Sequence, residues 1–298
     1  MKKIIYSLIF ILAVLPIVSC SKDDPDENQS IIQVNSKSKN AFDKWLDNNY
    51  VLPYNIRFMY RMETIESDMN YTLVPAIMGY SIPMAHMVKY MCLEAYDEVA
   101  GVSFTRKYFP KQIHLIGSPA YNNNGTIVLG VAEGGKKITL YNINSLQTIF
   151  NNGVDAVNDY YFHTIHHEFS HILHQTKPYP ASFSQISGAD YVSGNWSDDQ
   201  FISGYLQRGF VSAYAQSSDD EDFAEMVSIY ITNTADYWNN LIASAGSGAA
   251  KIKAKFDLID TYMKKEWNID LSTLRQEIIR RENDVFSGKI DLNSVEID

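Results

Sequence analysis

The apolar and polar positions divide the chain into an N-terminal apolar run and a long patterned region. Residues 4–18 are almost entirely apolar and follow Lys2 and Lys3. Such a run is typical of an export signal and is short for a membrane-spanning helix. The polar, largely acidic stretch that follows has little to bury. We therefore expect a signal peptide over residues 1–20, a flexible acidic tether over 21–38 and one folded domain over 39–298.

Within the folded region the pattern predicts strands first and helices later. Short apolar runs bounded by turn residues predict strands, whereas apolar residues that recur three and four positions apart predict helices. The expected strands cover residues 55–60, 112–117, 125–130 and 138–143, of which the last two can form a hairpin. The expected helices cover 40–53, most of 72–108, 155–175, 219–246 and 249–285, with a loop over 176–204. This order favours an α+β fold with a sheet-containing lobe over 39–175 and a helical lobe over 176–298.

Charge and cysteine content narrow the range of partners. The chain carries 25 Lys and Arg against 35 Asp and Glu, which gives a net charge of −10. An acidic chain without a basic patch does not suit nucleic acid, so we exclude that partner. The two cysteines are Cys20, at the end of the export signal, and Cys92, in an apolar helical context. We expect Cys92 to be a buried, inert thiol.

A metal-binding motif lies on the predicted helix over residues 155–175. Residues 167–171 have the sequence HEFSH, which matches the pattern H-E-x-x-H. His167 and His171 share a helix face, so both rings can bind one zinc ion. Glu168 then lies beside the metal and can act as a general base. His163 and His167 have the same spacing, but only the later pair has a glutamate directly after its first histidine.

A catalytic zinc site needs a third protein ligand, since three ligands and a water are the usual arrangement. The metzincin extension of the motif fails, because His174 and Lys177 stand where that pattern requires glycine and histidine. The downstream helix offers Glu221 and Glu225, which share one face. One carboxylate can bind zinc while the other accepts the free ring N–H of a ligand histidine. The residues alone leave open which of the two binds zinc, and Asp222 is a further candidate.

The segments HEFSH and YAQSSDDEDFAE together resemble the zincin peptidases related to the catalytic domain of anthrax lethal factor. The resemblance implies a zincin-like metallopeptidase fold with a mixed sheet, an active-site helix and a helical C-terminal lobe. It assigns Glu221 as the third ligand, Glu225 as the acceptor behind a ligand histidine, and Tyr214 as the hydroxyl that stabilises the transition state. It also implies that the strand over 138–143 is the edge strand with which an extended peptide pairs.

The whole chain also resembles the zinc metallohydrolase lipoproteins of Bacteroidetes. This resemblance rests on the lipobox IVSC at residues 17–20, the acidic tether, Trp45, the sequence PYNI at 53–56 and the HEFSH and EDFAE segments. It implies that Cys20 is lipidated and that the mature protein is an outer-membrane lipoprotein exposed at the cell surface. It further implies association with an outer-membrane import complex. A periplasmic lipoprotein with a solvated linker is the alternative.

Together these motifs predict a metallopeptidase that uses Zn²⁺ and acts on a peptide or protein substrate. Glu168 would take a proton from the attacking water, and Tyr214 or His166 would help to hold the oxyanion. Two other functions stay open at this level. One is zinc-dependent hydrolysis of a non-peptide amide. The other is a surface-anchored binding component of a nutrient-uptake complex with a vestigial zinc site.

Overall fold

The computed structural model describes residues 38–62, 70–121, 127–128, 130–133 and 136–297. The chain divides into two units, Met1–Lys39 and Asn40–Asp298, and every described helix and strand belongs to the second. The predicted signal peptide, the lipidation site Cys20 and nearly all of the tether lie outside the described residues. Among the helices that are described, none combines the length and the apolarity needed to cross a bilayer.

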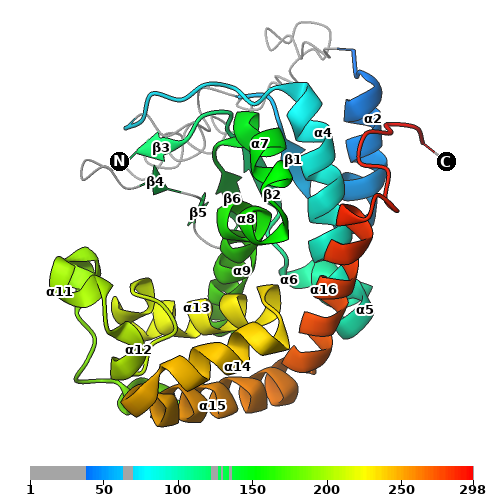
Figure 1. The fold of residues 1–298 in the computed structure, drawn as a ribbon. Helices are drawn as coiled ribbons and strands as arrows, with labels where there is room; N and C mark the ends of the chain where they lie inside the picture. Colours follow the sequence, from blue (N-terminus) through cyan, green and yellow to red (C-terminus); the bar gives the residue numbers. More distant parts are fainter. Residues whose placement is uncertain (1–37, 63–69, 122–126, 129, 134–135, 298) are drawn as a thin grey trace, which may run out of the picture. The chain divides into compact units, whose positions relative to one another are not determined.

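A small sheet lies at the centre of the first half of the domain (Figure 1). Its strands follow the order β1, β2, β6, β5, where β1 is Arg57–Met59, β2 is Gln112–Leu115, β6 is Lys137–Leu140 and β5 is Gly130–Glu133. The first two pairings are parallel and the last is antiparallel. The short strands β3 (Ala120–Tyr121) and β4 (Ile127–Val128) form a separate antiparallel pair.

The position of β6 corrects one expectation. The sequence predicts a strand over 138–143 that is the edge strand for a substrate, but β6 is buried at all four positions and pairs with a strand on both sides. The chain reverses before β6, so that β5 occupies the place beyond it. The edge of the sheet on this side is therefore β5, which packs against α9 (His163–Thr176). The predicted hairpin between residues 125–130 and 138–143 is also corrected, because Ile127 and Val128 pair with β3 and the strand that pairs with β6 is Gly130–Glu133.

The described helices that precede β2 lie within residues 41–108, and η2 contacts β1. Asn40 caps α2 through a reciprocal capping box with Asp43, and the segment ends just after Pro53, where Asn55 adopts a left-handed conformation with φ of 53°. The elements in this part are α2 (Ala41–Leu46), η2 (Asp47–Val51), α3 (Leu52–Tyr54), α4 (Met78–Met87), η4 (Val88–Leu93), α5 (Glu94–Ala100) and α6 (Val102–Tyr108).

The second half is almost entirely helical. The predicted loop over 176–204 contains short helices, and the predicted helix over 219–246 is two helices, because Thr234 caps a new one. The elements are η5 (Ile143–Ser145), α7 (Leu146–Asn151), α8 (Val154–Val157), η6 (Asn158–Phe162), α9 (His163–Thr176), α10 (Ser182–Ile186), η7 (Ser193–Ser197), α11 (Asp199–Ile202), α12 (Tyr205–Arg208), η8 (Tyr214–Gln216), α13 (Asp219–Thr232), α14 (Ala235–Ser244), η9 (Gly246–Gly248), α15 (Ala249–Trp267) and α16 (Leu271–Phe286).

The last helix ties the two halves together. Figure 1 shows α16, in red, returning alongside α5, and α16 also packs against α13. Arg281 of α16 donates to the Glu94 carboxylate at 2.9 Å, and Tyr90 donates to Asp284 at 3.0 Å. Residues 40–298 consequently form one compact unit, and the division into lobes at residue 175 stays a prediction. Cys92 is fully buried in this region, as the sequence predicts.

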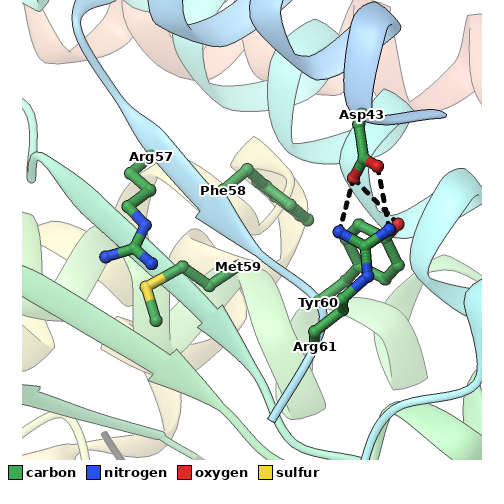
Figure 2. Close-up of a pocket in the computed structure, with 6 residues that line it drawn as sticks. All are labelled: Asp43, Arg57, Phe58, Met59, Tyr60 and Arg61. Carbon is green, nitrogen blue, oxygen red and sulfur yellow. Dashed lines mark hydrogen bonds and ion pairs between the residues drawn. The ribbon is translucent and has the colours of Figure 1, made fainter. Parts of the chain in front are cut away.

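A cavity of about 120 Å³ lies beside β1, and Figure 2 shows the side chains that line it: Asp43, Arg57, Phe58, Met59, Tyr60 and Arg61. The guanidinium of Arg61 meets the Asp43 carboxylate through two N···O contacts of 2.8 Å. The Tyr60 hydroxyl donates to the same carboxylate at 2.9 Å. These bonds fasten β1 to α2. None of the lining residues belongs to the helices that carry HEFSH or EDFAE.

Candidate metal centre

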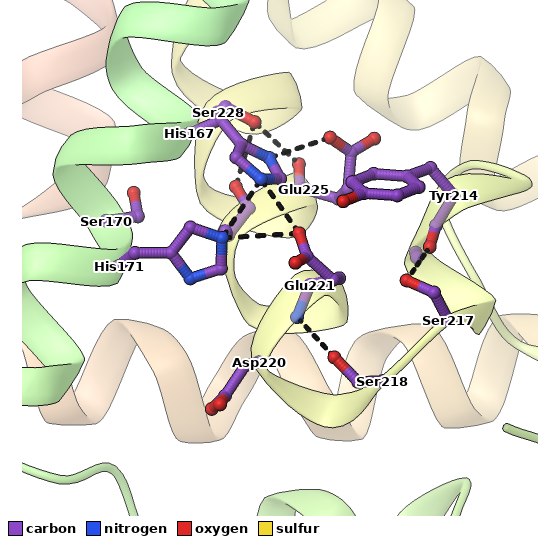
Figure 3. Close-up of polar contacts among 12 residues, drawn as sticks. His167, Ser170, His171, Tyr214, Ser217, Ser218, Asp220, Glu221, Glu225 and Ser228 are labelled. Carbon is purple, nitrogen blue, oxygen red and sulfur yellow. Dashed lines mark hydrogen bonds and ion pairs between the residues drawn. The ribbon is translucent and has the colours of Figure 1, made fainter. Parts of the chain in front are cut away.

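The histidines of the HEFSH motif lie on α9, whose opposite face is buried in the core. Ile165, Phe169 and Leu173 recur every four residues and are at most 1% exposed. The Phe169 ring packs against the rings of Tyr96 and Phe109, each at a centroid distance of 4.9 Å. This aromatic cluster fixes the rotation of α9 about its axis. The motif histidines are thereby turned toward α13 (Figure 3).

Helix α13 carries the acidic segment and begins at a defined cap. The Ser218 side chain accepts a hydrogen bond from the backbone N–H of Glu221 at 3.2 Å, which satisfies one of the free donors of the first turn. Phe223, Met226 and Val227 are buried on the core side of the helix. The cap and this packing together direct the Glu221 side chain at the histidines of α9.

Three side-chain atoms that can bind a metal lie close together between the two helices. Oε2 of Glu221 lies 2.9 Å from Nε2 of His167 and 3.2 Å from Nε2 of His171, and the two Nε2 atoms are 3.1 Å apart. Two imidazole nitrogens and one carboxylate oxygen are ligands that zinc takes in catalytic sites. Tetrahedral ligands at the usual distances from zinc would be about 3.3 Å apart. The side chains therefore fit a zinc ion both in kind and in spacing.

Glu225 lies behind His167, one helical turn beyond Glu221. Its Oε1 is 2.8 Å from Nδ1 of His167, within ion-pair distance although not aligned as a hydrogen bond, and 2.8 Å from Nε2 of His163. Its Oε2 accepts a hydrogen bond from the Ser212 hydroxyl at 2.6 Å. Glu221 thus faces the Nε2 atoms of both motif histidines, whereas Glu225 faces Nδ1 on the other side of the His167 ring.

Burial and these contacts set the protonation of the cluster. Burial disfavours a charged His167, but the carboxylates of Glu221 and Glu225 outweigh it and raise the pKa of His167 to about 10. Burial would likewise raise the pKa of Glu221, but hydrogen bonds from His167 and His171 lower that pKa to about 2. The Glu221 carboxylate is therefore ionised at neutral pH. A proton on His167 balances it, and a bound cation would have to displace that proton.

Glu168 and Tyr214 border the same site. Glu168 follows His167 on α9, is partly exposed, and its charge acts on both His167 and Tyr214. Tyr214 lies in η8, with its ring 5.9 Å from the His167 ring and 36% of the residue exposed (Figure 3). Burial, and then the Glu221 carboxylate, raises the pKa of Tyr214, so its hydroxyl keeps its proton and can donate it.

The structure removes His166 from the candidates for holding an oxyanion. Its ring is fully buried on the core side of α9, where Nδ1 lies 3.1 Å from the Tyr96 hydroxyl and Nε2 faces the Cys92 thiol. Burial lowers the pKa of His166 to about 3. The sequence-based hypothesis for His166 was wrong because position 166 is one residue before the ligand face and points into the core.

Asp222 is likewise turned away from the histidines. Its carboxylate pairs with Lys255 of α15 at 2.5 Å and accepts a hydrogen bond from Tyr191 at 2.9 Å. Both charged side chains are 0% exposed. Burial raises the pKa of Asp222 to about 6, even though Lys255 acts to lower it. This ion pair holds α13 against α15.

Sequence reasoning gave no role at the site to His174 and Ser212 and favoured a packing or surface role for His163, although each contacts the site in the structure. His163 and Ser212 both contact Glu225, and His174 contacts His171. The helical spacing of His163 and His174 from the motif was a usable signal, because residues three and four apart face one another on a helix. Nothing in the sequence distinguishes Ser212 from the other serines.

Comparison with known proteins agrees with this geometry. Residues 35–272 match the model of a family described as putative zinc-binding metallo-peptidase. The chain belongs to this family. A crystal structure from Bacteroides caccae with the same description is 44% identical to the chain and superposes with a TM-score of 0.74. The match covers 86% of this chain and 96% of that one. A comparison with curated proteins gave no match.

Membership of the zinc-binding metallo-peptidase family supports the metal and the general class of reaction. The matched region contains both α9 and α13 in full. The structural match also accounts for the mixed, mostly helical fold with its small sheet. Zinc is the metal that the family is described as binding.

Proposed function

We propose that this chain hydrolyses peptide bonds with a zinc ion held by His167, His171 and Glu221. The observation that carries the proposal is the meeting of three donor atoms within 3.2 Å of one another, between helices whose sequences are far apart. Bound zinc lowers the pKa of water and polarises a carbonyl group. Side chains of the protein would supply the proton transfers and the hydrogen bond to the oxyanion.

Glu168 is proposed as the general base and acid. It is next to a ligand histidine and partly exposed, so it can reach an attacking water, take its proton and deliver that proton to the leaving amine. Tyr214 is proposed as the donor to the oxyanion, since its protonated hydroxyl borders the site. Glu225 would hold the His167 ring in place from behind.

The sheet supports a peptide as the substrate. The edge strand β5 packs against α9, and among the described strands it pairs with β6 alone. An extended peptide could add to the other side of β5 through backbone hydrogen bonds, as peptides do at exposed sheet edges. We propose β5 for this role in place of the strand that the sequence indicated.

The location of the protein is a separate proposal that rests on the sequence. The lipobox at residues 17–20 and the acidic residues that follow support lipidation at Cys20 and anchoring in the outer membrane, facing the cell surface. Association with an outer-membrane import complex is proposed on the same grounds. Labelling with a lipid precursor in cells, compared between wild type and Cys20→Ala, would test the anchor.

Zinc content is the first test of the proposed function. Residues 21–298 would be produced without the signal, and bound zinc measured by mass spectrometry for wild type and for His167→Ala. About one zinc per wild-type chain, lost in the variant, is expected. The wild type should then cleave peptides from a mixed library, and Glu168→Gln serves as the inactive control that keeps its metal. A folded wild type that takes up no zinc when supplied with it would refute the proposal.

A further inference from the structure

The two motif histidines have different neighbours on the ring nitrogen that faces away from Glu221. For His167 that atom, Nδ1, faces the Glu225 carboxylate. For His171, Nδ1 lies 2.9 Å from Nε2 of His174, on the same helix. Ligand histidines usually meet a carboxylate, a backbone carbonyl or a water at this point. In this chain a second histidine lies in that place.

Hydrogen-bond chemistry determines the proton positions along this contact. A neutral imidazole that binds a metal through Nε2 carries its proton on Nδ1. His171 therefore donates from Nδ1, and Nε2 of His174 must accept. The proton of His174 is then on its Nδ1, which lies 3.5 Å from Oδ1 of Asp220. The same oxygen accepts a hydrogen bond from the Tyr179 hydroxyl at 2.7 Å.

Packing holds the His174 ring in the orientation that this contact needs. His174 is 5% exposed and packs against the rings of Tyr179 and Phe223, each at a centroid distance of 5.4 Å. Those two rings stack on each other at a centroid distance of 4.9 Å, so the three rings pack together as one aromatic cluster. Phe223 belongs to the helix that carries Glu221. This cluster therefore holds His174, which is on α9, against α13.

We propose that His174 is a positioning residue that orients His171 by accepting the hydrogen bond from its Nδ1. The inference rests on the proposed function, in which His171 binds zinc through Nε2. His174 itself does not contact the metal, because its Nε2 is occupied by His171 and its Nδ1 is directed at Asp220. Without this acceptor, the His171 ring loses the partner that fixes its tautomer and rotation.

Two variants separate the acceptor from the packing. His174→Phe keeps a ring packed against Tyr179 and Phe223 but removes the acceptor. His174→Gln places an amide oxygen at about the reach of Nε2 and so restores it. Zinc affinity would be measured by competition with a chelator, and the visible spectrum of the Co²⁺-substituted protein would report the ligand geometry. Thermal unfolding of the metal-free proteins would report packing alone.

The expected result is a loss of zinc affinity of roughly 10- to 100-fold in His174→Phe, with an altered Co²⁺ spectrum. His174→Gln should bind zinc nearly as tightly as wild type. Equal affinity in wild type and a folded His174→Phe would overturn the inference. Equal weakening in both variants would also overturn it, because the effect would then come from packing. If His174→Phe does not fold, His174→Leu takes its place. Wild-type protein without zinc would instead refute the proposed function itself.

Discussion

Oε2 of Glu221 lies 2.9 Å from Nε2 of His167, although the two residues are 54 positions apart in the sequence. Each is held by its own helix, and each helix is fixed by separate contacts with the core. The distance between them is thus a property of how α9 and α13 pack, rather than of either segment alone.

Replacing Glu168 with Gln should abolish catalysis without removing the metal. The amide has nearly the shape of the carboxylate but cannot take a proton, so kcat should fall by roughly 10²- to 10⁴-fold. Zinc content, measured on the same sample, should stay at the wild-type level. A variant that keeps full turnover would show that Glu168 is not the base.

Glu221 and Glu225 should behave differently when each is changed to Ala. Glu221→Ala removes a proposed ligand, so the purified protein should lose most of its zinc. Glu225→Ala removes only the group behind His167, and zinc affinity should fall by roughly 10- to 100-fold while a saturating supply restores full occupancy. The two titrations would be run side by side. The opposite order of effects would make Glu225 the ligand.

Tyr214→Phe should lower kcat and leave KM nearly unchanged. The hydroxyl is proposed to act on charge that develops only in the transition state, and removal of one such donor typically costs about 10²- to 10³-fold in kcat. Trp196, whose ring lies 5.1 Å from that of Tyr214, offers a control, because Trp196→Phe changes the neighbouring packing but not the hydroxyl. An unchanged kcat in Tyr214→Phe would mean that another donor holds the oxyanion.

Glu282 should make the folded protein less stable as the pH rises. The residue is 5% exposed, and burial raises its pKa to about 7, only partly opposed by a hydrogen bond from Asn158. The folded state therefore binds this proton more tightly than the unfolded state does. The resulting stabilisation is complete below the unfolded pKa and is lost as the pH rises through about 7.

Glu282→Gln removes this titration. The variant should match wild type near pH 4 and exceed it at pH 8, by up to about 3 kcal/mol in the free energy of unfolding. Denaturant unfolding of the metal-free proteins at both pH values measures the difference. Glu277→Gln is a control of opposite sign, since hydrogen bonds from Arg280 and Arg281 lower the pKa of Glu277. Parallel pH profiles for wild type and Glu282→Gln would contradict the prediction.

Lys255→Met should destabilise the fold by about 3–5 kcal/mol, because it leaves the Asp222 carboxylate buried without its partner. The double variant with Asp222→Leu removes both charges and should recover much of that loss. Chemical denaturation of the four proteins of this cycle supplies the numbers. A single variant as stable as wild type would show that the pair is not needed to hold α13 against α15.

Sequence by itself determined the features that depend on local periodicity. The four-residue spacing of His167 and His171 places both on one face of any regular helix. The strand positions of β1 and β2, the main helices and the burial of Cys92 followed from the same kind of pattern. These features concern residues that are neighbours along the chain.

Only the tertiary structure decided what depends on how distant segments meet. It placed Glu221 rather than Glu225 against the Nε2 atoms of both motif histidines, buried His166 in the core, and made β5 the edge of the sheet. The two glutamates share one face of α13, so periodicity cannot separate them. The rotation of α13 against α9 separates them, and that rotation is set by aromatic packing and by the buried Asp222 pair. These contacts join parts of the chain whose spacing no local pattern encodes.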